Sequence, residues 1–298
     1  MPEPRAIRKV YQSQPTLEGA GVHLKRAFGF REPRRFDPFL LLDDFRNDRS
    51  ENYLKGFPWH PHRGIETITY VLRGDVEHGD SMGNQGVISS GDVQWMTAGS
   101  GIIHQEMPKG DAQGAMYGFQ LWANLPASHK MMPPRYREVK SSQIPEVSLE
   151  NGARVRIICG QVEDVQGPVR DIITDPAYLD IHLPPACNFI HPTPVGHTVF
   201  AYVFEGQARF SSVGESDSAQ NSSPNQAFLG NESVVLFEDG DSVRVITANE
   251  PVRFLLISGK PINEPVAWYG PIVMNTQSEL QTAFDELQAG TFIRHKTE

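Results

Sequence analysis

The chain has 298 residues, of which 39% are hydrophobic and 21% charged, a composition that excludes disordered and fibrous proteins. Its formal net charge of −9 argues against direct binding to nucleic acid, because neutralising phosphates requires a dense basic surface. No segment is apolar over a membrane's thickness or resembles a secretory signal, and Cys159 and Cys187 cannot build a disulfide framework, so we expect a cytoplasmic protein with no membrane partner.

The first feature along the chain is a basic segment near the N-terminus. It contains only three carboxylates, Glu3, Glu18 and Glu32, beside eight basic residues. A solvated charged face and a contact surface for an acidic protein partner both explain this pattern. The basic residues are Arg5, Arg8, Lys9, Lys25, Arg26, Arg31, Arg34 and Arg35.

Short β-branched and aromatic runs, separated by Gly, Pro, Asn and Asp, follow throughout the chain and are typical of an all-β sandwich or barrel. One helix closes the chain, since Thr276 and Glu279 form a capping box and three apolar residues then share a face. We expect this helix to pack on a barrel. The strands are expected over residues 65–72, 87–89, 92–96, 117–122, 155–158, 199–204, 234–237 and 254–257.

An internal repeat divides the chain. Tyr-Val-Leu-Arg-Gly at 70–74 recurs as Tyr-Val-Phe-Glu-Gly at 202–206, and Gly91-Asp92 recurs as Gly240-Asp241, each before a strand. A proline-rich stretch over 132–151 resembles a connection between the two copies. We therefore predict two domains, 1–140 and 141–298, with the helix at the end of the second.

Two short motifs in the first copy have the composition of a metal site. His60 and His62 precede the strand at 65–72, and residues two apart in an extended chain point to the same side, so His60, His62 and Glu66 are predicted to face inward with the even-numbered apolar residues. His104 and Glu106 repeat this spacing after a glycine-rich turn. Three imidazoles and a carboxylate suit Fe(II), Mn(II), Ni(II) or Cu(II), and Zn is a further alternative.

The second copy serves as an internal control. Its positions equivalent to the donors are occupied by residues that mostly do not bind metals, although His191 and His197 lie nearby. We therefore expect one metal ion per chain and a purely structural second barrel. The equivalent residues are Pro192, Pro194, Thr198, Arg253 and Leu255.

The motifs resemble those of the cupins and, more closely and over nearly the whole chain, those of the pirin family. The matching segments are 37–44 (DPFLLLDD), 60–66 (HPHRGIE), 91–99 (GDVQWMTAG), 101–108 (GIIHQEMP), 120–125 (QLWANL) and 270–275 (GPIVMN). The resemblance implies a bicupin, two antiparallel jelly-roll barrels, with one Fe(II) held by His60, His62, His104 and Glu106. Glu66, the usual cupin carboxylate ligand, competes with Glu106 for the fourth position, and we favour Glu106.

The resemblance implies two alternative functions. The first is a quercetin 2,3-dioxygenase-type oxygenase acting on a flavonol and dioxygen, with Glu66 as general base and Glu106 at the metal. The second is a regulatory protein, such as a transcriptional co-regulator, that uses the metal as a redox sensor and binds its partner at the basic segment; a nuclear location would then apply in a eukaryote. We expect a monomer in either case. Arg63 is predicted either to orient an anion or to form a surface ion pair, and Phe57, Trp59, Trp95, Met96 and Trp122 are candidates to line the site.

Overall fold

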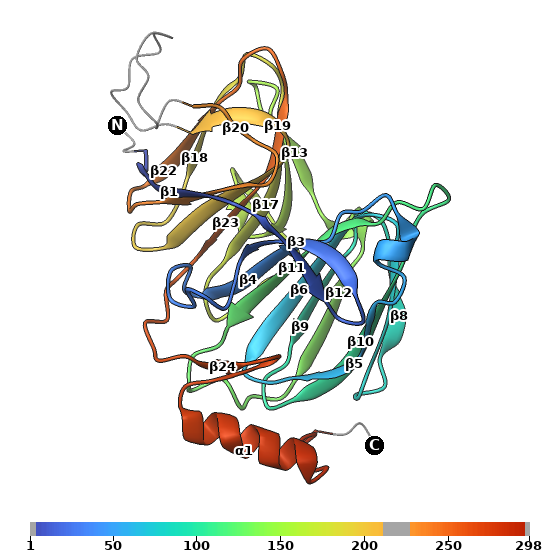
Figure 1. The fold of residues 1–298 in the computed structure, drawn as a ribbon. Coiled ribbons are helices and arrows are strands. Elements are labelled where there is room, and N and C mark those ends of the chain that lie inside the picture. Colours follow the sequence, from blue (N-terminus) through green and yellow to red (C-terminus); the bar gives the residue numbers. More distant parts are fainter. Residues whose placement is uncertain (1–3, 211–226, 296–298) are drawn as a thin grey trace. The chain divides into compact units, whose positions relative to one another are not determined.

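The computed structural model describes residues 4–210 and 227–295 (Figure 1). The chain forms two compact units. The first unit consists of residues 14–143 and 262–298, and the second unit of residues 1–13 and 144–261. The boundary at 143/144 lies close to the predicted one. The chain ends, however, are exchanged, because the first 13 residues join the second unit and the C-terminal segment joins the first, which differs from the predicted domains.

The first unit contains two antiparallel sheets. The seven-stranded sheet has the order β12 (Arg135–Val139), β9 (Val93–Thr97), β6 (Ile65–Arg73), β11 (Tyr117–Asn124), β4 (Phe39–Asp44), β3 (Val22–Phe28) and β2 (Gln14–Glu18). The four-stranded sheet has the order β5 (Phe57–His62), β10 (Ile102–Lys109), β7 (Asp75–Asp80) and β8 (Gln85–Ile88). Two short 3₁₀ helices, η1 (Ser50–Asn52) and η2 (Ser141–Gln143), lie in its connections.

The C-terminal segment completes the first unit. It forms the hairpin of β24 (Ala267–Tyr269) and β25 (Ile272–Met274), followed by α1 (Gln277–Gln288). The predicted capping box is confirmed, with Thr276 accepting from the backbone of Glu279 and Glu279 accepting from that of Thr276. Leu280 packs in a buried cluster with Ile272 and Phe292. Within the described residues, no helix has the length and apolar character needed to cross a membrane.

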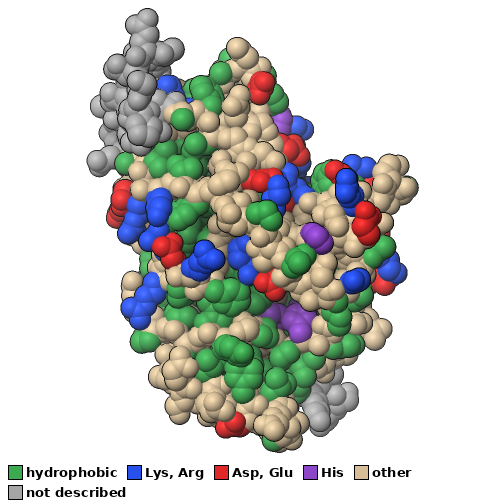
Figure 2. Space-filling model, viewed as in Figure 1, with side chains coloured by type: hydrophobic (Ala, Val, Ile, Leu, Met, Phe, Trp, Pro, Cys, Tyr) green, Lys and Arg blue, Asp and Glu red, His purple; other side chains and the backbone are tan. Residues whose placement is uncertain are grey.

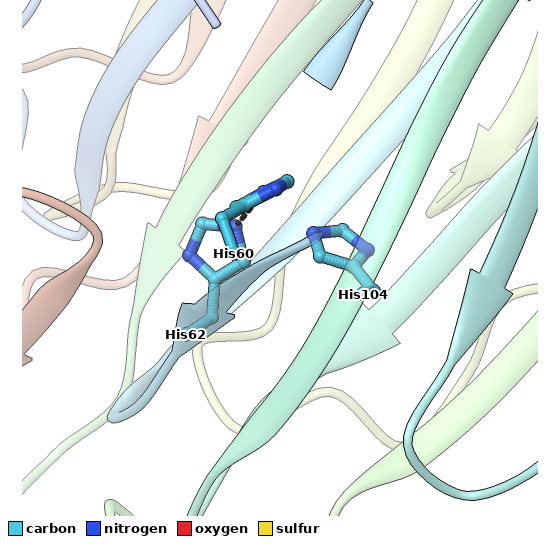
Figure 3. A group of neighbouring side chains, drawn as sticks. All are labelled: His60, His62 and His104. Atoms are coloured by element: carbon cyan, nitrogen blue, oxygen red, sulfur yellow. Dashed lines mark hydrogen bonds between the residues drawn. The ribbon is translucent and has the colours of Figure 1, made fainter. Parts of the chain in front are cut away.

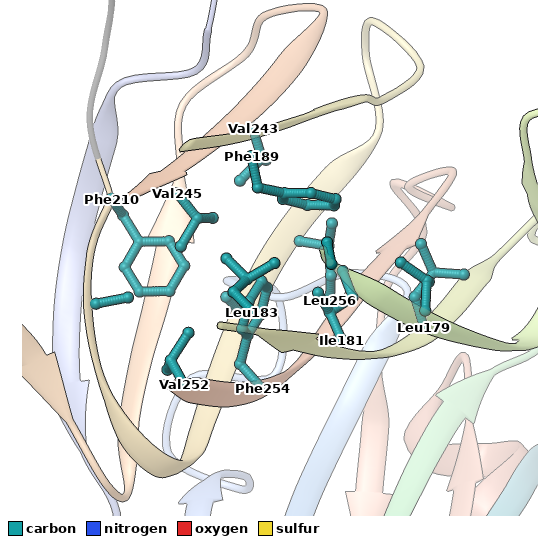
Figure 4. Packing of buried hydrophobic residues seen from close by; sticks show 14 of the residues in the cluster. Leu179, Ile181, Leu183, Phe189, Phe210, Val243, Val245, Val252, Phe254 and Leu256 are labelled. Carbon is teal, nitrogen blue, oxygen red and sulfur yellow. The ribbon is translucent and has the colours of Figure 1, made fainter. Parts of the chain in front are cut away.

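The second unit is built around one large antiparallel sheet. Its main path is β1 (Ile7–Gln12), β21 (Ser233–Phe237), β19 (Thr198–Phe210), β23 (Val252–Gly259), β17 (Ala177–Leu183), β14 (Arg154–Cys159) and β13 (Glu146–Ser148). Beside this path, β18 (Asn188–Pro192) pairs with β22 (Ser242–Ile246), β20 (Leu229–Gly230) pairs with β19, and β15 (Gln161–Val162) pairs with β16 (Val165–Gln166). Aliphatic and aromatic side chains fill the interior (Figure 4). Cys159 and Cys187 are buried, and neither forms a disulfide within the described residues.

The two large sheets share one topology, which confirms the predicted repeat at its first motif. Tyr70 of β6 pairs with Val93 of β9, and Tyr202 of β19 pairs with Val234 of β21 in the same place. The second motif was aligned wrongly. Gly240-Asp241 precedes β22, which pairs with β18 as β10 pairs with β5, so this segment corresponds to the start of β10 and not to Gly91-Asp92.

Candidate metal centre

Three histidine side chains converge in the first unit. His60 and His62 lie on β5 and His104 lies on the neighbouring strand β10, directly opposite His60. Their potential ligand atoms all lie within 4.8 Å of one another, and the three rings turn toward a common point (Figure 3). The structure therefore brings together the three histidines that the sequence predicted as ligands.

The hydrogen bonds of these rings favour metal binding. Nδ1 of His60 lies 2.9 Å from the Pro58 carbonyl oxygen, and Nδ1 of His62 lies 3.1 Å from that of Pro271. A carbonyl accepts, so each Nδ1 carries the proton and each Nε2 presents a lone pair. The two Nε2 atoms are only 3.1 Å apart, and the buried Nε2 of His104 has no partner within the described residues.

This arrangement fits a divalent transition metal. Two lone pairs facing each other repel unless a cation lies between them, and two nitrogens bound side by side at about 2.1 Å from one ion are separated by roughly 3 Å. Burial also lowers the pKa of His60 and lowers those of His62 and His104 well below the usual histidine value. The rings are therefore neutral at physiological pH, as metal ligands must be.

Glu106 lies beside the histidines but is not part of the three-residue group. Its carboxylate lines the same cavity as His60 and His62, and the Thr69 hydroxyl lies 2.9 Å from its Oε1. Burial raises the pKa of Glu106 to about 7, and the hydrogen bond from Thr69 opposes that rise. Among the described residues, the cluster of donors within 4.8 Å contains the histidines alone, so Glu106 as fourth ligand stays a prediction.

Glu66 occupies the opposite face of the seven-stranded sheet. It pairs with Thr97 and Ala123, whereas the next residue, Thr67, pairs with the cavity-lining Trp122. The Thr97 hydroxyl donates to the Glu66 carboxylate at 2.6 Å. This differs from the prediction that Glu66 faces the histidines.

The reason is the turn between β5 and β6. Gly64 has a φ of +78°, and a Cβ there would lie 2.0 Å from the Val273 carbonyl oxygen. A turn through this conformation interrupts the two-residue alternation, so the parity of His60 and His62 does not continue into β6. The inward face of β6 is instead its threonine face, with Thr69 against Glu106. The signal was present in the sequence, since Thr67 and Thr69 alternate with Ile68 and Tyr70 along β6.

His60 and His62 line a cavity of about 420 Å³ in the first unit, a volume in the range of small-molecule sites. Figure 2 shows histidine side chains recessed among hydrophobic ones on the face drawn. Of the predicted lining residues, Phe57 and Trp122 line the cavity. Trp95 pairs with Ile68 on the far side of the sheet, Met96 is buried in a neighbouring cluster, and Trp59 is 55% exposed.

Arg63 holds the chain around the site instead of entering it. Its side chain is buried, donates to the carbonyl oxygens of Ser100 and Phe292, and forms an ion pair with Glu286 at 2.7 Å. It thus links the segment next to His62 with the C-terminal segment that supplies the Pro271 carbonyl. Both predictions for Arg63 were therefore wrong, because its side chain neither lines the cavity nor forms an exposed ion pair.

Sequence reasoning missed several polar residues of the cavity. Arg26, Asp43, Thr69 and Gln120 line it from four strands of the large sheet. Each lies on a strand in which apolar neighbours partly hide the alternation of polar and apolar residues, so no sequence motif identified these four residues. Pro271 was also missed as a site residue, because a backbone carbonyl leaves no trace in side-chain patterns.

The second unit has a different interior at the corresponding place. The prediction aligned Pro192 and Pro194 with His60 and His62, but both prolines are exposed, and the buried residues of β18 and the turn after it are Phe189, His191 and Thr193. His191 lies opposite Val243 of β22, in the place where His60 lies opposite His104. The second unit therefore has a histidine, His191, in the place of His60, but has Val243 in the place of His104. Burial lowers the pKa of His191 to about 4, which keeps this ring neutral.

Comparison with known proteins gives consistent results. Residues 21–123 match the family model described as Pirin, and residues 178–293 match that of the Pirin C-terminal cupin domain. A pirin-like protein of Caulobacter vibrioides is 44% identical over 97% of this chain and 99% of its own length. The solved structure of quercetin 2,3-dioxygenase from Acinetobacter baumannii is 31% identical, with a TM-score of 0.83 over 97% of this chain and 98% of that chain. Pirin-1 of Arabidopsis thaliana is 39% identical over 96% of this chain and 93% of its own length.

Proposed function

The chain belongs to the pirin family, and from this premise we propose that it is a metal-dependent oxygenase of the quercetin 2,3-dioxygenase type, acting on a flavonol and dioxygen. The observation that carries the proposal is the convergence of three neutral imidazoles, two of which line a cavity of about 420 Å³. The similarity to the Acinetobacter baumannii quercetin 2,3-dioxygenase supports the substrate class.

His60, His62 and His104 would hold the ion, with Glu106 as the proposed fourth ligand and Fe(II) as the proposed metal. When bound, a divalent metal supplies a Lewis acid that polarises a substrate oxygen and lowers the pKa of its hydroxyl group. Thr69 orients the Glu106 carboxylate. Trp122 packs edge-on against His62, with ring centroids 5.0 Å apart, so it fixes that ring and covers it from water.

The test uses protein purified without added metal. Elemental analysis is expected to find close to one transition-metal ion per chain, and oxygen uptake with quercetin is expected at about 1–10³ turnovers per second. His60→Ala combined with His104→Ala should abolish both. His191→Ala is the matched control and should retain both, because it removes a buried histidine from the other unit. Two ions per chain, or metal retained by the double variant, would refute the site.

The regulatory alternative has less support. The basic residues predicted as a possible contact surface for a partner divide between the two units. Arg5 is buried, where it donates to Thr193, and Arg26 is paired with Asp43. Oxygen uptake far below one turnover per second with every flavonol, despite a full complement of metal, would favour the regulatory function over catalysis.

A further inference from the structure

A row of polar side chains crosses the floor of the metal cavity. Arg26 of β3 lies opposite Asp43 of β4, Asp43 opposite Gln120 of β11, and Gln120 opposite Thr69 of β6. Directly opposite residues of antiparallel strands share a face, and all four line the cavity. The Thr69 hydroxyl lies 2.6 Å from the side-chain oxygen of Gln120, so the row ends at the residue that contacts Glu106.

Three aromatic side chains lie between the histidines at one end of this row and Arg26 at the other. Trp122 packs against His62, and Trp268 lies next to Trp122, with ring centroids 6.1 Å apart. Phe30 packs on Trp268 at 4.1 Å, and the Arg26 guanidinium lies over the Phe30 ring at 5.3 Å. Aromatic rings therefore accompany the polar row from the histidines to Arg26, and two of them, Trp122 and Phe30, line the cavity.

The far end of the row is an ion pair within a largely apolar cavity. Nε and one terminal nitrogen of Arg26 donate to the two carboxylate oxygens of Asp43 at 2.8 and 2.7 Å, and Glu18 lies 2.8 Å from the other terminal nitrogen. The Asp43 side chain is 7% exposed. Burying such a pair carries a desolvation cost, and a pair of apolar residues would fill the same space more favourably. A functional reason for keeping it is a ligand group that binds there.

We propose that Arg26 and Asp43 form a subsite that binds a phenolic hydroxyl group of the substrate, on a ring remote from the metal ligands. Neighbouring strands lie about 4.8 Å apart, so three steps from β3 to β6 span roughly 14 Å, which is comparable with the length of a three-ring flavonol. The guanidinium donates a hydrogen bond to the hydroxyl oxygen, and the hydroxyl group donates one to the carboxylate. The ligand class is a planar, polyhydroxylated aromatic molecule.

The subsite rests on the proposed function for its substrate class, so its test measures binding without turnover. Quenching of tryptophan fluorescence under anaerobic conditions gives the Kd of quercetin and of 3-hydroxyflavone, which keeps only the hydroxyl at carbon 3. The wild-type protein is expected to bind quercetin at least about tenfold more tightly, because only quercetin offers Arg26 and Asp43 a hydroxyl group to hydrogen-bond in a buried site. Arg26→Met combined with Asp43→Leu is expected to reduce this ratio to less than about threefold, mainly by weakening quercetin binding.

A matched control removes a similar ion pair outside the cavity. Arg46 also donates to both carboxylate oxygens of Asp44, which follows Asp43 in the chain. Arg46→Met combined with Asp44→Leu should therefore keep the wild-type ratio of the two Kd values. Arg26→Lys keeps the positive charge but loses the bidentate hydrogen bond to Asp43, so it should give an intermediate ratio. This variant replaces the double variant in the test if the double variant does not fold.

Equal wild-type affinities for the two flavonols, or an unchanged ratio in both Arg26 variants, would overturn the subsite. Oxygen uptake is measured in parallel on the same proteins. Selective binding without turnover would refute the proposed oxygenase while keeping the subsite. Oxygen uptake by a protein that binds the two flavonols equally would refute the subsite while keeping the proposed oxygenase.

Discussion

Replacing Arg63 by methionine tests whether the C-terminal segment is part of the metal centre. Arg63 follows the ligand His62 directly, and its guanidinium contacts Ser100, Phe292 and Glu286. The Phe292 ring also lies under the guanidinium, 4.2 Å from its central carbon. Methionine keeps most of the length of the side chain but none of these polar contacts.

The magnitude follows from burial. Arg63 is 1% exposed, and breaking a buried ion pair by removing one partner costs about 3–5 kcal/mol, because the remaining groups lose their compensation. Arg294 pairs with the same Glu286, but its side chain is 47% exposed, and exposed pairs contribute about 0–1 kcal/mol. Arg63→Met is therefore expected to lower the free energy of unfolding by about 2–5 kcal/mol more than Arg294→Met.

Chemical denaturation of the metal-free variants measures that difference. Hydrogen exchange should show faster opening of residues 267–294 in Arg63→Met, and its metal affinity should fall about tenfold or more, as for the loss of a group that orients a ligand. Equal stability and equal metal affinity in the Arg63 and Arg294 variants would show that the C-terminal segment does not support the site.

Three other predictions concern the carboxylates, the second unit and the isolated first half. Glu106→Gln should weaken metal binding at least about tenfold, measured by competition with a coloured chelator, whereas Glu66→Gln should change it less than about threefold; the reverse order would restore Glu66 as ligand. Because the folded pKa of His191 is lowered from 6.5 to about 4, the unfolded state binds the extra proton in this window, so stability is lost as pH falls through it. In metal-free protein, the stability difference between wild type and His191→Phe should shift by roughly 2 kcal/mol from pH 7.5 to pH 5, and no shift would refute the assignment. Residues 1–140 alone should neither fold nor bind metal by circular dichroism and elemental analysis, since they lack 262–298 of the same unit.

The sequence predicted the elements of this fold well where the signal is local. The strands at 65–72 and 254–257 and the capped helix at 276–288 appear where expected, because alternation and capping depend on neighbouring residues. The histidines were found for a similar reason, since two-residue spacing on one strand determines a shared face. Their pairing across β5 and β10 could be inferred only from the resemblance and the repeated motif.

Long-range relations were harder to predict. The exchange of the chain ends depends on pairs such as Ile7 with Phe237, which no local pattern encodes. The orientation of Glu66 depends on the conformation of Gly64, and a single turn of this kind reverses every residue that follows. The polar row from Arg26 to Thr69 is visible only after four strands are placed in register.

The exchanged ends impose an order on biosynthesis. A ribosome makes β1 before any of the first unit, yet its partner β21 appears only more than two hundred residues later. The first unit in turn waits for residues 262–298, which are made after the whole second unit. His62 therefore has no Pro271 carbonyl, and Arg63 no Glu286, until the C-terminal segment has followed the second unit out of the ribosome. We therefore expect metal loading to follow the arrival of the C-terminal segment and not the emergence of the histidines themselves.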